Sequence, residues 1–162
     1  MPSLQRSKLS LVLLAAVLSL PSQAPAADNS LLLFGGEDHD RFLGCLSCWR
    51  SEAFSVWNEK SEYGSTTHPD SIWNPNGRFG AATSLLSPWN SWAPNPPIVV
   101  DRAGNLYGFF TRNPNIPGRI TSPPPFDPEH TAIERDGFRF LAWLLDDYEW
   151  IIRNLDEVRA DH

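Results

Sequence analysis

Ser55–Asn90 reads SVWNEKSEYGSTTHPDSIWNPNGRFGAATSLLSPWN, and three times within it a serine leads into a tryptophan-asparagine pair. The three copies begin 16 residues apart. The first two also carry an aromatic-glycine pair at the same offset, Tyr63-Gly64 and Phe79-Gly80. A fixed period of this kind is typical of an internal repeat, so it is the first feature that the fold must accommodate.

Each repeat is too short for a pair of helices, and its Asn, Pro and Gly residues favour turns. We therefore expect each unit to be a turn with short extended or single-turn helical pieces. Tryptophan buries more area than any other residue, which favours a core role for the repeat tryptophans and a turn or capping role for the asparagines. The alternative is an exposed ladder that binds sugar rings or a peptide. The residues of this candidate binding surface are Trp57, Asn58, Trp73, Asn74, Trp89 and Asn90.

The segments on either side of the repeats are typical of strands. Leu31–Phe34 is a short apolar run that ends at Gly35-Gly36, which predicts a strand followed by a turn. After the repeats, Ile98–Val100 and Leu106–Phe110 flank a turn-forming segment, which predicts a β-hairpin.

The last part of the chain predicts one long amphipathic helix. Thr131–Glu134 fits a capping box, and the helix is expected to run from there, or from a restart near Gly137, to about Val158. Its apolar side chains recur at spacings of three and four, and leaving such a wide apolar face in water is costly. We expect this face to pack on the repeat domain. Its residues are Leu141, Leu144, Leu145, Tyr148, Ile151, Ile152, Leu155 and Val158.

The first 26 residues read as a secretory signal. Arg6 and Lys8 precede the apolar stretch Leu9–Leu20, and Ala24–Ala26 supplies the small residues of a cleavage site. The stretch is shorter than the roughly 20 residues that a membrane helix needs, and no second one follows. We therefore expect an exported protein, periplasmic or extracellular, with no membrane span in the mature chain.

These patterns divide the chain into four segments: a signal peptide (1–26), a repeat and hairpin domain (27–118), a proline-rich connector (119–130) and a C-terminal helix (131–162). The predicted fold class is α+β. It combines a small turn- and β-rich repeat domain, a hairpin and the long helix.

The charge of the chain disfavours two classes of partner. The formal net charge is −6 at pH 7, and removal of Arg6 and Lys8 with the signal leaves Lys60 as the last lysine. A surface this acidic offers no continuous basic area for a phosphate backbone, so we expect no nucleic-acid binding. Anionic membrane surfaces are disfavoured for the same reason.

Cys45-Leu46-Ser47-Cys48 is the one spacing that suggests chemistry. In an exported chain a structural disulfide is favoured. A redox pair normally opens a helix after a strand in a βαβ pattern, which is absent here. A metal site needs further ligands, and His39 with Asp40, or alternatively with Asp38, would have to complete it. The sequence leaves the disulfide, the redox pair and the metal site open.

The sequence contains none of the familiar nucleophile, zinc-protease, phosphate-loop or dinucleotide motifs. We therefore expect a non-catalytic binding or envelope-structural module that needs no cofactor and whose partner is a glycan or an envelope protein. One alternative is a small periplasmic or secreted enzyme, a hydrolase or metal-dependent, centred on residues 39–48. The other is a carbohydrate-binding module that uses the repeat tryptophans.

The repeats resemble those of a group of uncharacterised bacterial exported proteins. Members of that group have tandem Ser-Ile/Val-aromatic-Asn units with aromatic-Gly-Ser, a closing Ser-Pro-aromatic-Asn unit, and then a Pro-Pro-hydrophobic strand with Asp, Gly and aromatic-Gly. The similarity runs from about Phe42 to Asn113, and the C-terminal helix lies outside it. In the first copy, the residues Glu59–Glu62 before Tyr63 depart from the aromatic-glycine spacing that is usual in that group. The resemblance implies no activity, ligand or catalytic residue.

Overall fold

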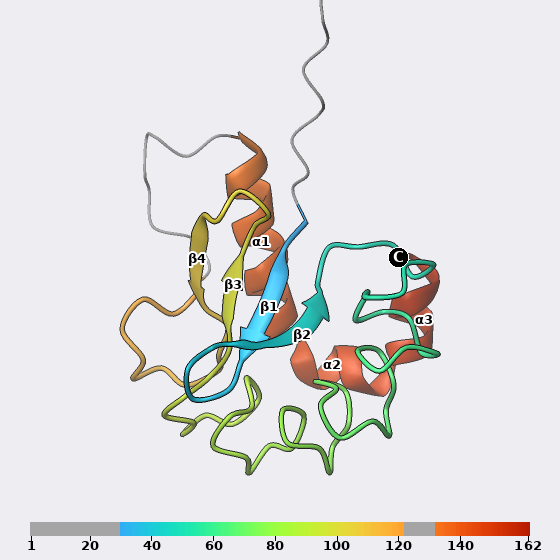
Figure 1. Cartoon of the computed structure of the whole chain (residues 1–162), viewed down its shortest axis with the longest axis horizontal. Coiled ribbons are helices and arrows are strands. Elements are labelled where there is room, and N and C mark those ends of the chain that lie inside the picture. Colours follow the sequence, from blue (N-terminus) through green and yellow to red (C-terminus); the bar gives the residue numbers. More distant parts are fainter. Residues whose placement is uncertain (1–29, 122–131) are drawn as a thin grey trace, which may run out of the picture.

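The structure is a computed structural model, and it describes residues 30–121 and 132–162. The fold combines a four-stranded antiparallel sheet, three helices and the repeat segment, whose loops form the lower edge of the molecule in Figure 1. The predicted α+β class is therefore confirmed. The expected signal peptide, most of the connector and Thr131 of the expected capping box lie outside the described residues.

The sheet has the strand order β2-β1-β3-β4. Its strands are β1 (Leu32–Gly35), β2 (Arg41–Cys45), β3 (Ile98–Val100) and β4 (Leu106–Phe109). The strand expected after the N-terminal segment and the hairpin expected after the repeats are both present. Because β1 pairs with β3, the repeat segment is inserted between two halves of one sheet.

The sequence did not predict β2. Gly44 lies within it at φ +113°, and an added Cβ there would lie 2.9 Å from Val56 Cγ1 and from Tyr63 Cβ. A glycine inside a strand often indicates close approach of another segment, and it also weakens the strand pattern. Here the missing side chain lets β2 lie directly against the first repeat.

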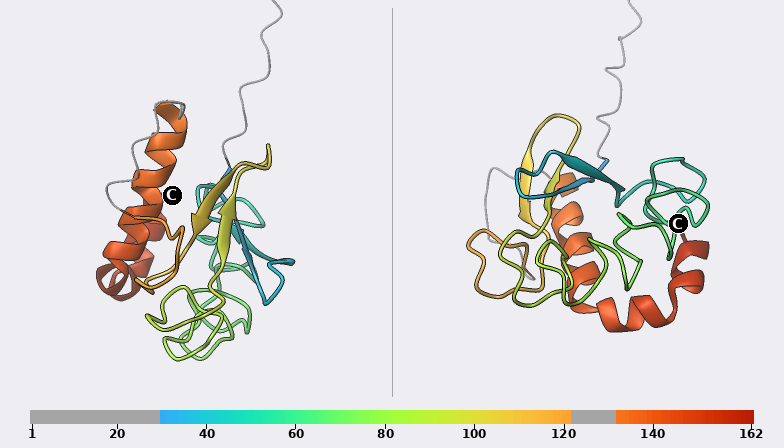
Figure 2. Two further views of the ribbon diagram at one scale, coloured as in Figure 1. Left: turned by 90° about the vertical axis from the view of Figure 1, so that its left-hand side faces the viewer. Right: turned by 60° about the horizontal axis from the view of Figure 1, so that its bottom comes forward.

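The C-terminal region forms three helices instead of one long helix: α1 (Ala132–Asp146), α2 (Tyr148–Arg153) and α3 (Leu155–Ala160). The breaks fall at Asp147 and Asn154, whose backbone angles are not helical. They turn the chain, so that α1 lies along the sheet and α2 and α3 curve around the repeats (Figure 2). The prediction of a continuous helix is wrong because the apolar face has to cover two surfaces that face different ways.

The apolar positions predicted for that helix do face the core. Seven of the eight are buried, and Ile152 is partly buried against the same cluster. The cluster also takes side chains from the sheet and from all three repeats, so the described residues share one hydrophobic core. Among the described residues, no helix is both long and apolar enough to cross a membrane.

Candidate functional site

The three repeat tryptophans form a buried ladder. The exposed fractions of Trp57, Trp73 and Trp89 are 0%, 1% and 2%. Successive ring centroids lie 5.3 Å and 5.7 Å apart. Each indole N–H also donates a hydrogen bond to a backbone carbonyl from the preceding part of the chain. The acceptors are Leu46 O at 2.7 Å, Val56 O at 2.6 Å and Ile72 O at 2.6 Å.

Both ends of the ladder are covered by the C-terminal region. The His162 ring stacks on Trp57 at a centroid distance of 4.3 Å, and the Tyr148 ring stacks on Trp89 at 4.1 Å. Phe110 adds an edge contact to Trp89. No ring face of the ladder is left for a sugar or a peptide, so the alternative of an exposed ladder is not what the structure shows.

The asparagines that follow these tryptophans close the turns of the repeats. In each copy the side-chain amide donates to a carbonyl six residues back and accepts from the backbone N–H two residues ahead. The donor bonds of Asn58, Asn74 and Asn90 reach Glu52 O, His68 O and Ser84 O at 3.1, 3.0 and 2.9 Å. The accepted bonds come from Lys60, Asn76 and Trp92 at 3.0, 3.0 and 2.9 Å. The NH₂ group and the oxygen of each side-chain amide are therefore both hydrogen-bonded within the fold.

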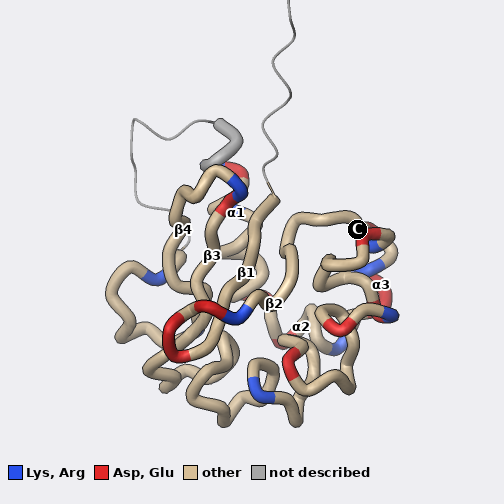
Figure 3. Tube along the Cα trace, in the orientation of Figure 1, with Lys and Arg blue, Asp and Glu red and all other residues tan. Residues whose placement is uncertain are grey.

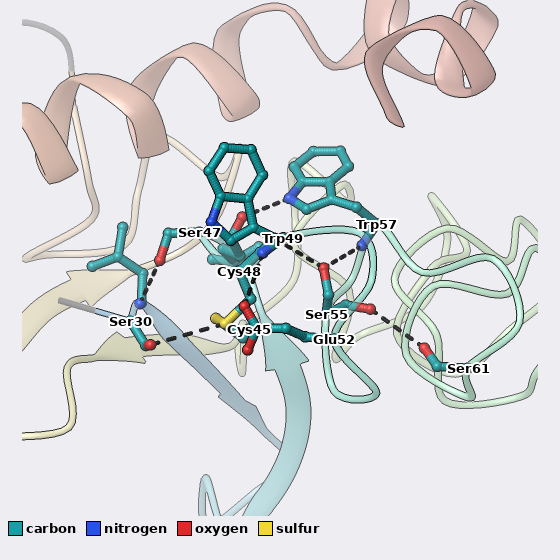
Figure 4. Close-up of a disulfide and its surroundings, with 11 residues drawn as sticks. Ser30, Cys45, Ser47, Cys48, Trp49, Glu52, Ser55, Trp57 and Ser61 are labelled. Atoms are coloured by element: carbon teal, nitrogen blue, oxygen red, sulfur yellow. Dashed lines mark hydrogen bonds between the residues drawn. A yellow bond between two sulfur atoms is a disulfide. The ribbon is translucent and has the colours of Figure 1, made fainter. Parts of the chain in front are cut away.

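The cysteines form a disulfide, with Cα atoms 5.5 Å apart (Figure 4). Their thiolates are then not available to a metal. His39 Nε2 lies 2.9 Å from the carbonyl oxygen of Pro96, and Asp40 is exposed on the neighbouring turn. The described residues contain no group of three potential ligands, so the metal set of His39, Asp40, Cys45 and Cys48 is not assembled here.

The disulfide leads directly into Trp49, whose side chain is 69% exposed. The Trp49 backbone N–H donates to Glu52 Oε1 at 3.1 Å, and Glu52 N–H donates back to Trp49 O at 2.9 Å. Ser55 Oγ donates to Cys48 O at 3.0 Å (Figure 4). The turn that carries this exposed indole is therefore tied in place on both sides.

Trp49 lies at the edge of a hollow of about 620 Å³, which we call the Trp49 hollow. Apart from the rings of Trp49 and His162, its lining side chains are polar. Arg50 and Glu59 form an ion pair across it at 3.1 Å. The full lining is Trp49, Arg50, Ser51, Asn58, Glu59, Lys60 and His162. No sequence motif marks Trp49 as a binding residue, although its position outside the 16-residue frame indicates that it does not belong to the ladder.

A second hollow of about 760 Å³ lies between the repeat turns and the α2–α3 junction, and Glu59 lines both hollows. Arg159 lines it with an exposed fraction of only 3%. Its guanidinium donates to Gly64 O and lies 3.5 Å from an Asp156 carboxylate oxygen. Burial lowers the pKa of Arg159, while Asp156 and Glu59 act in the opposite direction. These contacts attach α3 to the first repeat.

A third hollow, of about 330 Å³, contains several titratable groups beside β2. His68 Nδ1 accepts the backbone N–H of Asp70 at 3.3 Å, and its Nε2 lies 3.8 Å from Glu62. Burial raises the pKa of Tyr63, and the hydrogen bond to Glu62 adds to that effect. Arg41 pairs with Asp70. Arg41 and Asp70, and His68 and Glu62, thus contact each other within this hollow.

Charged residues of both signs lie next to one another on the described surface (Figure 3). They gather at the β1–β2 turn and around α3, and the view shows no continuous basic area over the sheet. This arrangement matches the low content of Lys and Arg in the sequence.

No protein-family model matches the chain, and no curated protein or solved structure matches it either. The geometry of the described residues is therefore the basis for a functional conclusion.

Proposed function

We propose that this chain is an exported, non-catalytic binding module, in which the Trp-Asn repeats are the scaffold and the Trp49 hollow is the ligand surface. One observation carries the proposal: Trp49 is 69% exposed at the edge of a polar hollow, whereas no ladder tryptophan exceeds 2% and the exposed Trp92 does not line that hollow. Leaving a large apolar side chain in water forgoes about 1.5–3 kcal/mol of burial free energy. An exposed indole on a fixed turn beside a polar hollow is typical of a recognition site.

The contacts of His68 support binding over catalysis. His39 donates through Nε2 to the Pro96 carbonyl oxygen, whereas His68 accepts a backbone N–H at Nδ1 and has Nε2 3.8 Å from a Glu62 carboxylate oxygen. His162 stacks on Trp57. A general base needs a free lone pair directed at a substrate, and His68 already uses its Nδ1 lone pair to accept the backbone N–H of Asp70.

Two features support export. The N-terminal segment has the charged, apolar and small-residue regions of a secretory signal. The Cys45–Cys48 pair is disulfide-bonded, and disulfides persist in oxidising compartments outside the cytosol.

Co-sedimentation of the purified exported protein with isolated envelopes of the producing cell tests the proposal. We expect the wild-type protein to sediment with the envelopes and Trp49→Ala to bind at least tenfold more weakly. Trp92→Ala is the matched control, because Trp92 is 78% exposed but does not line the Trp49 hollow. Failure of the wild-type protein to sediment, or equal sedimentation of the two variants, would contradict the proposal.

A further inference from the structure

We infer that the Trp49 hollow binds a carbohydrate, with one pyranose ring stacked on the Trp49 indole and its hydroxyl groups bound by Arg50, Glu59 and Lys60. This inference rests on the proposed binding function and names its ligand class. It differs from the ladder hypothesis in placing the sugar on a tryptophan outside the repeat frame.

The lining of the hollow matches the two faces of a sugar ring. A pyranose has an apolar C–H face and a polar edge, so it needs one aromatic platform surrounded by hydrogen-bonding groups. The exposed Trp49 indole supplies the platform, and the lining contains no aliphatic side chain. A peptide that anchors through leucine or valine would find no apolar pocket here, which favours a sugar over a protein segment.

The ion pair across the hollow is suited to hydroxyl groups. Arg50 and Glu59 lie 3.1 Å apart, and the side chain of each is 42% exposed, so both keep open positions toward solvent. A vicinal diol donates to a carboxylate and accepts from a guanidinium at the same time. The charges of Arg50 and Glu59 offset each other, so with Lys60 the lining side chains carry one net positive charge, which suits a polar sugar better than a polyphosphate.

The hollow is also ordered before any ligand binds. Arg50 N–H donates to the backbone oxygen of His162 at 2.9 Å, and Lys60 N–H donates to Asn58 Oδ1 at 3.0 Å. The disulfide and the Trp49–Glu52 hydrogen bonds fix the turn that carries the Trp49 side of the hollow. A surface held in this way loses little conformational entropy on binding, which favours the shallow, weakly apolar contacts that sugars make.

Chemical treatment of the envelopes tests the ligand class. One sample is digested with protease, and a second is oxidised with periodate, which cleaves vicinal diols. We expect the wild-type protein to keep its binding to protease-treated envelopes and to lose at least tenfold on periodate-treated ones. Binding that survives periodate but is lost after protease overturns the carbohydrate inference and leaves the proposed binding function intact. Absence of binding to untreated envelopes overturns both.

A second measurement localises the sugar. Lys60 is the only lysine after Lys8, so reductive ¹³C-methylation gives a side-chain NMR reporter inside the hollow that keeps its charge. Soluble glycans released from the envelopes should shift this signal saturably in the wild-type protein and in Trp92→Ala. In Trp49→Ala, the half-saturation concentration should rise at least tenfold. A glycan that binds without moving the Lys60 signal, or that binds Trp49→Ala equally well, contradicts this location.

Discussion

At the residue scale, each repeat asparagine is a donor at one end and an acceptor at the other. Asn74 is 7% exposed, donates to His68 O and accepts from Asn76 N–H. Such a residue cannot be exchanged for its near isostere, because a carboxylate would place an oxygen against the His68 carbonyl oxygen.

We therefore expect Asn74→Asp to lower the free energy of unfolding by about 2 kcal/mol or more, the cost of a buried unsatisfied group. Asn76→Asp is the control, because Asn76 is exposed; it should stay within about 0.5 kcal/mol of the wild-type protein. Urea denaturation gives both values. Similar values for the two variants would show that the amide is not needed.

The repeat glycines are a second constraint at this scale. A Cβ on Gly80 would fall inside contact distance of the Asn74 carbonyl, and Gly64 has the same relation to Asn58. These glycines are therefore required by the close approach of one turn to the next.

Gly80→Ala is expected to cost about 3 kcal/mol or more, the upper range for overpacking. Gly104→Ala is the comparison: Gly104 has φ +90° and nothing within 4 Å of an added Cβ, so alanine there costs about 1–2 kcal/mol of left-handed backbone strain. Thermal unfolding followed by circular dichroism measures the difference. A smaller loss for Gly80→Ala than for Gly104→Ala would contradict the packing.

The sequence is informative about burial at this scale and uninformative about partners. The 16-residue frame separates Trp57, Trp73 and Trp89 from Trp49 and Trp92, and the structure buries the first set and exposes the second. The hydrogen-bond acceptors of the indoles depend on how successive turns stack, which no local pattern specifies. The Trp49 hollow also depends on His162, which is brought there only by the folding of α3.

At the scale of elements, the helices close the ladder. Tyr148 begins α2, is 9% exposed and stacks on Trp89 at a ring angle of 15°. Arg112 lies over the Tyr148 ring, 5.4 Å from its centroid. The break at Asp147 thus places the Tyr148 ring on Trp89. A continuous helix would carry this ring past the end of the ladder.

Tyr148→Ala should lower the free energy of unfolding by about 3–5 kcal/mol, as for other buried aromatic truncations. Tyr148→Phe keeps the stacking and the Arg112 contact, so it should lie within about 1 kcal/mol of the wild-type protein. Guanidinium denaturation followed by tryptophan fluorescence separates the two. Equal losses would mean that the ring does not close the ladder.

His162 closes the other end of the ladder and makes this contact sensitive to pH. Burial lowers the pKa of its imidazole below the ordinary value, and Asp161 partly offsets the shift. Folding therefore favours the neutral ring, so its contribution to stability is present above about pH 6.5 and is lost as the pH falls through the lower pKa of the folded state.

We expect the melting temperature of the wild-type protein to fall more between pH 7.5 and pH 5 than that of His162→Phe. Phenylalanine keeps the stacking on Trp57 but carries no titrating group. Scanning fluorimetry of both proteins across this range measures the two slopes. Parallel slopes would show that the imidazole does not titrate in contact with the ladder.

At the scale of the whole molecule, the chain builds one core from three parts that are far apart in sequence. β1 pairs with β3 across the whole repeat segment, and the helices return to cover both the sheet and the ladder. Local patterns predicted β1, β3 and β4 because each is a short apolar run with turn residues beside it. The strand order, β2 and the two helix breaks depend on contacts between distant segments, so the sequence alone did not reveal them.

The central claim for the whole molecule is that the repeat tryptophans are scaffold and that Trp49 is exposed at the binding surface. Hydrogen exchange of the indole N–H groups, followed by ¹⁵N NMR, tests it most directly. The indoles of Trp57, Trp73 and Trp89 donate to buried carbonyls and should exchange at least a hundredfold more slowly than those of Trp49 and Trp92. Exchange of the three ladder indoles as fast as that of Trp49 would contradict the account.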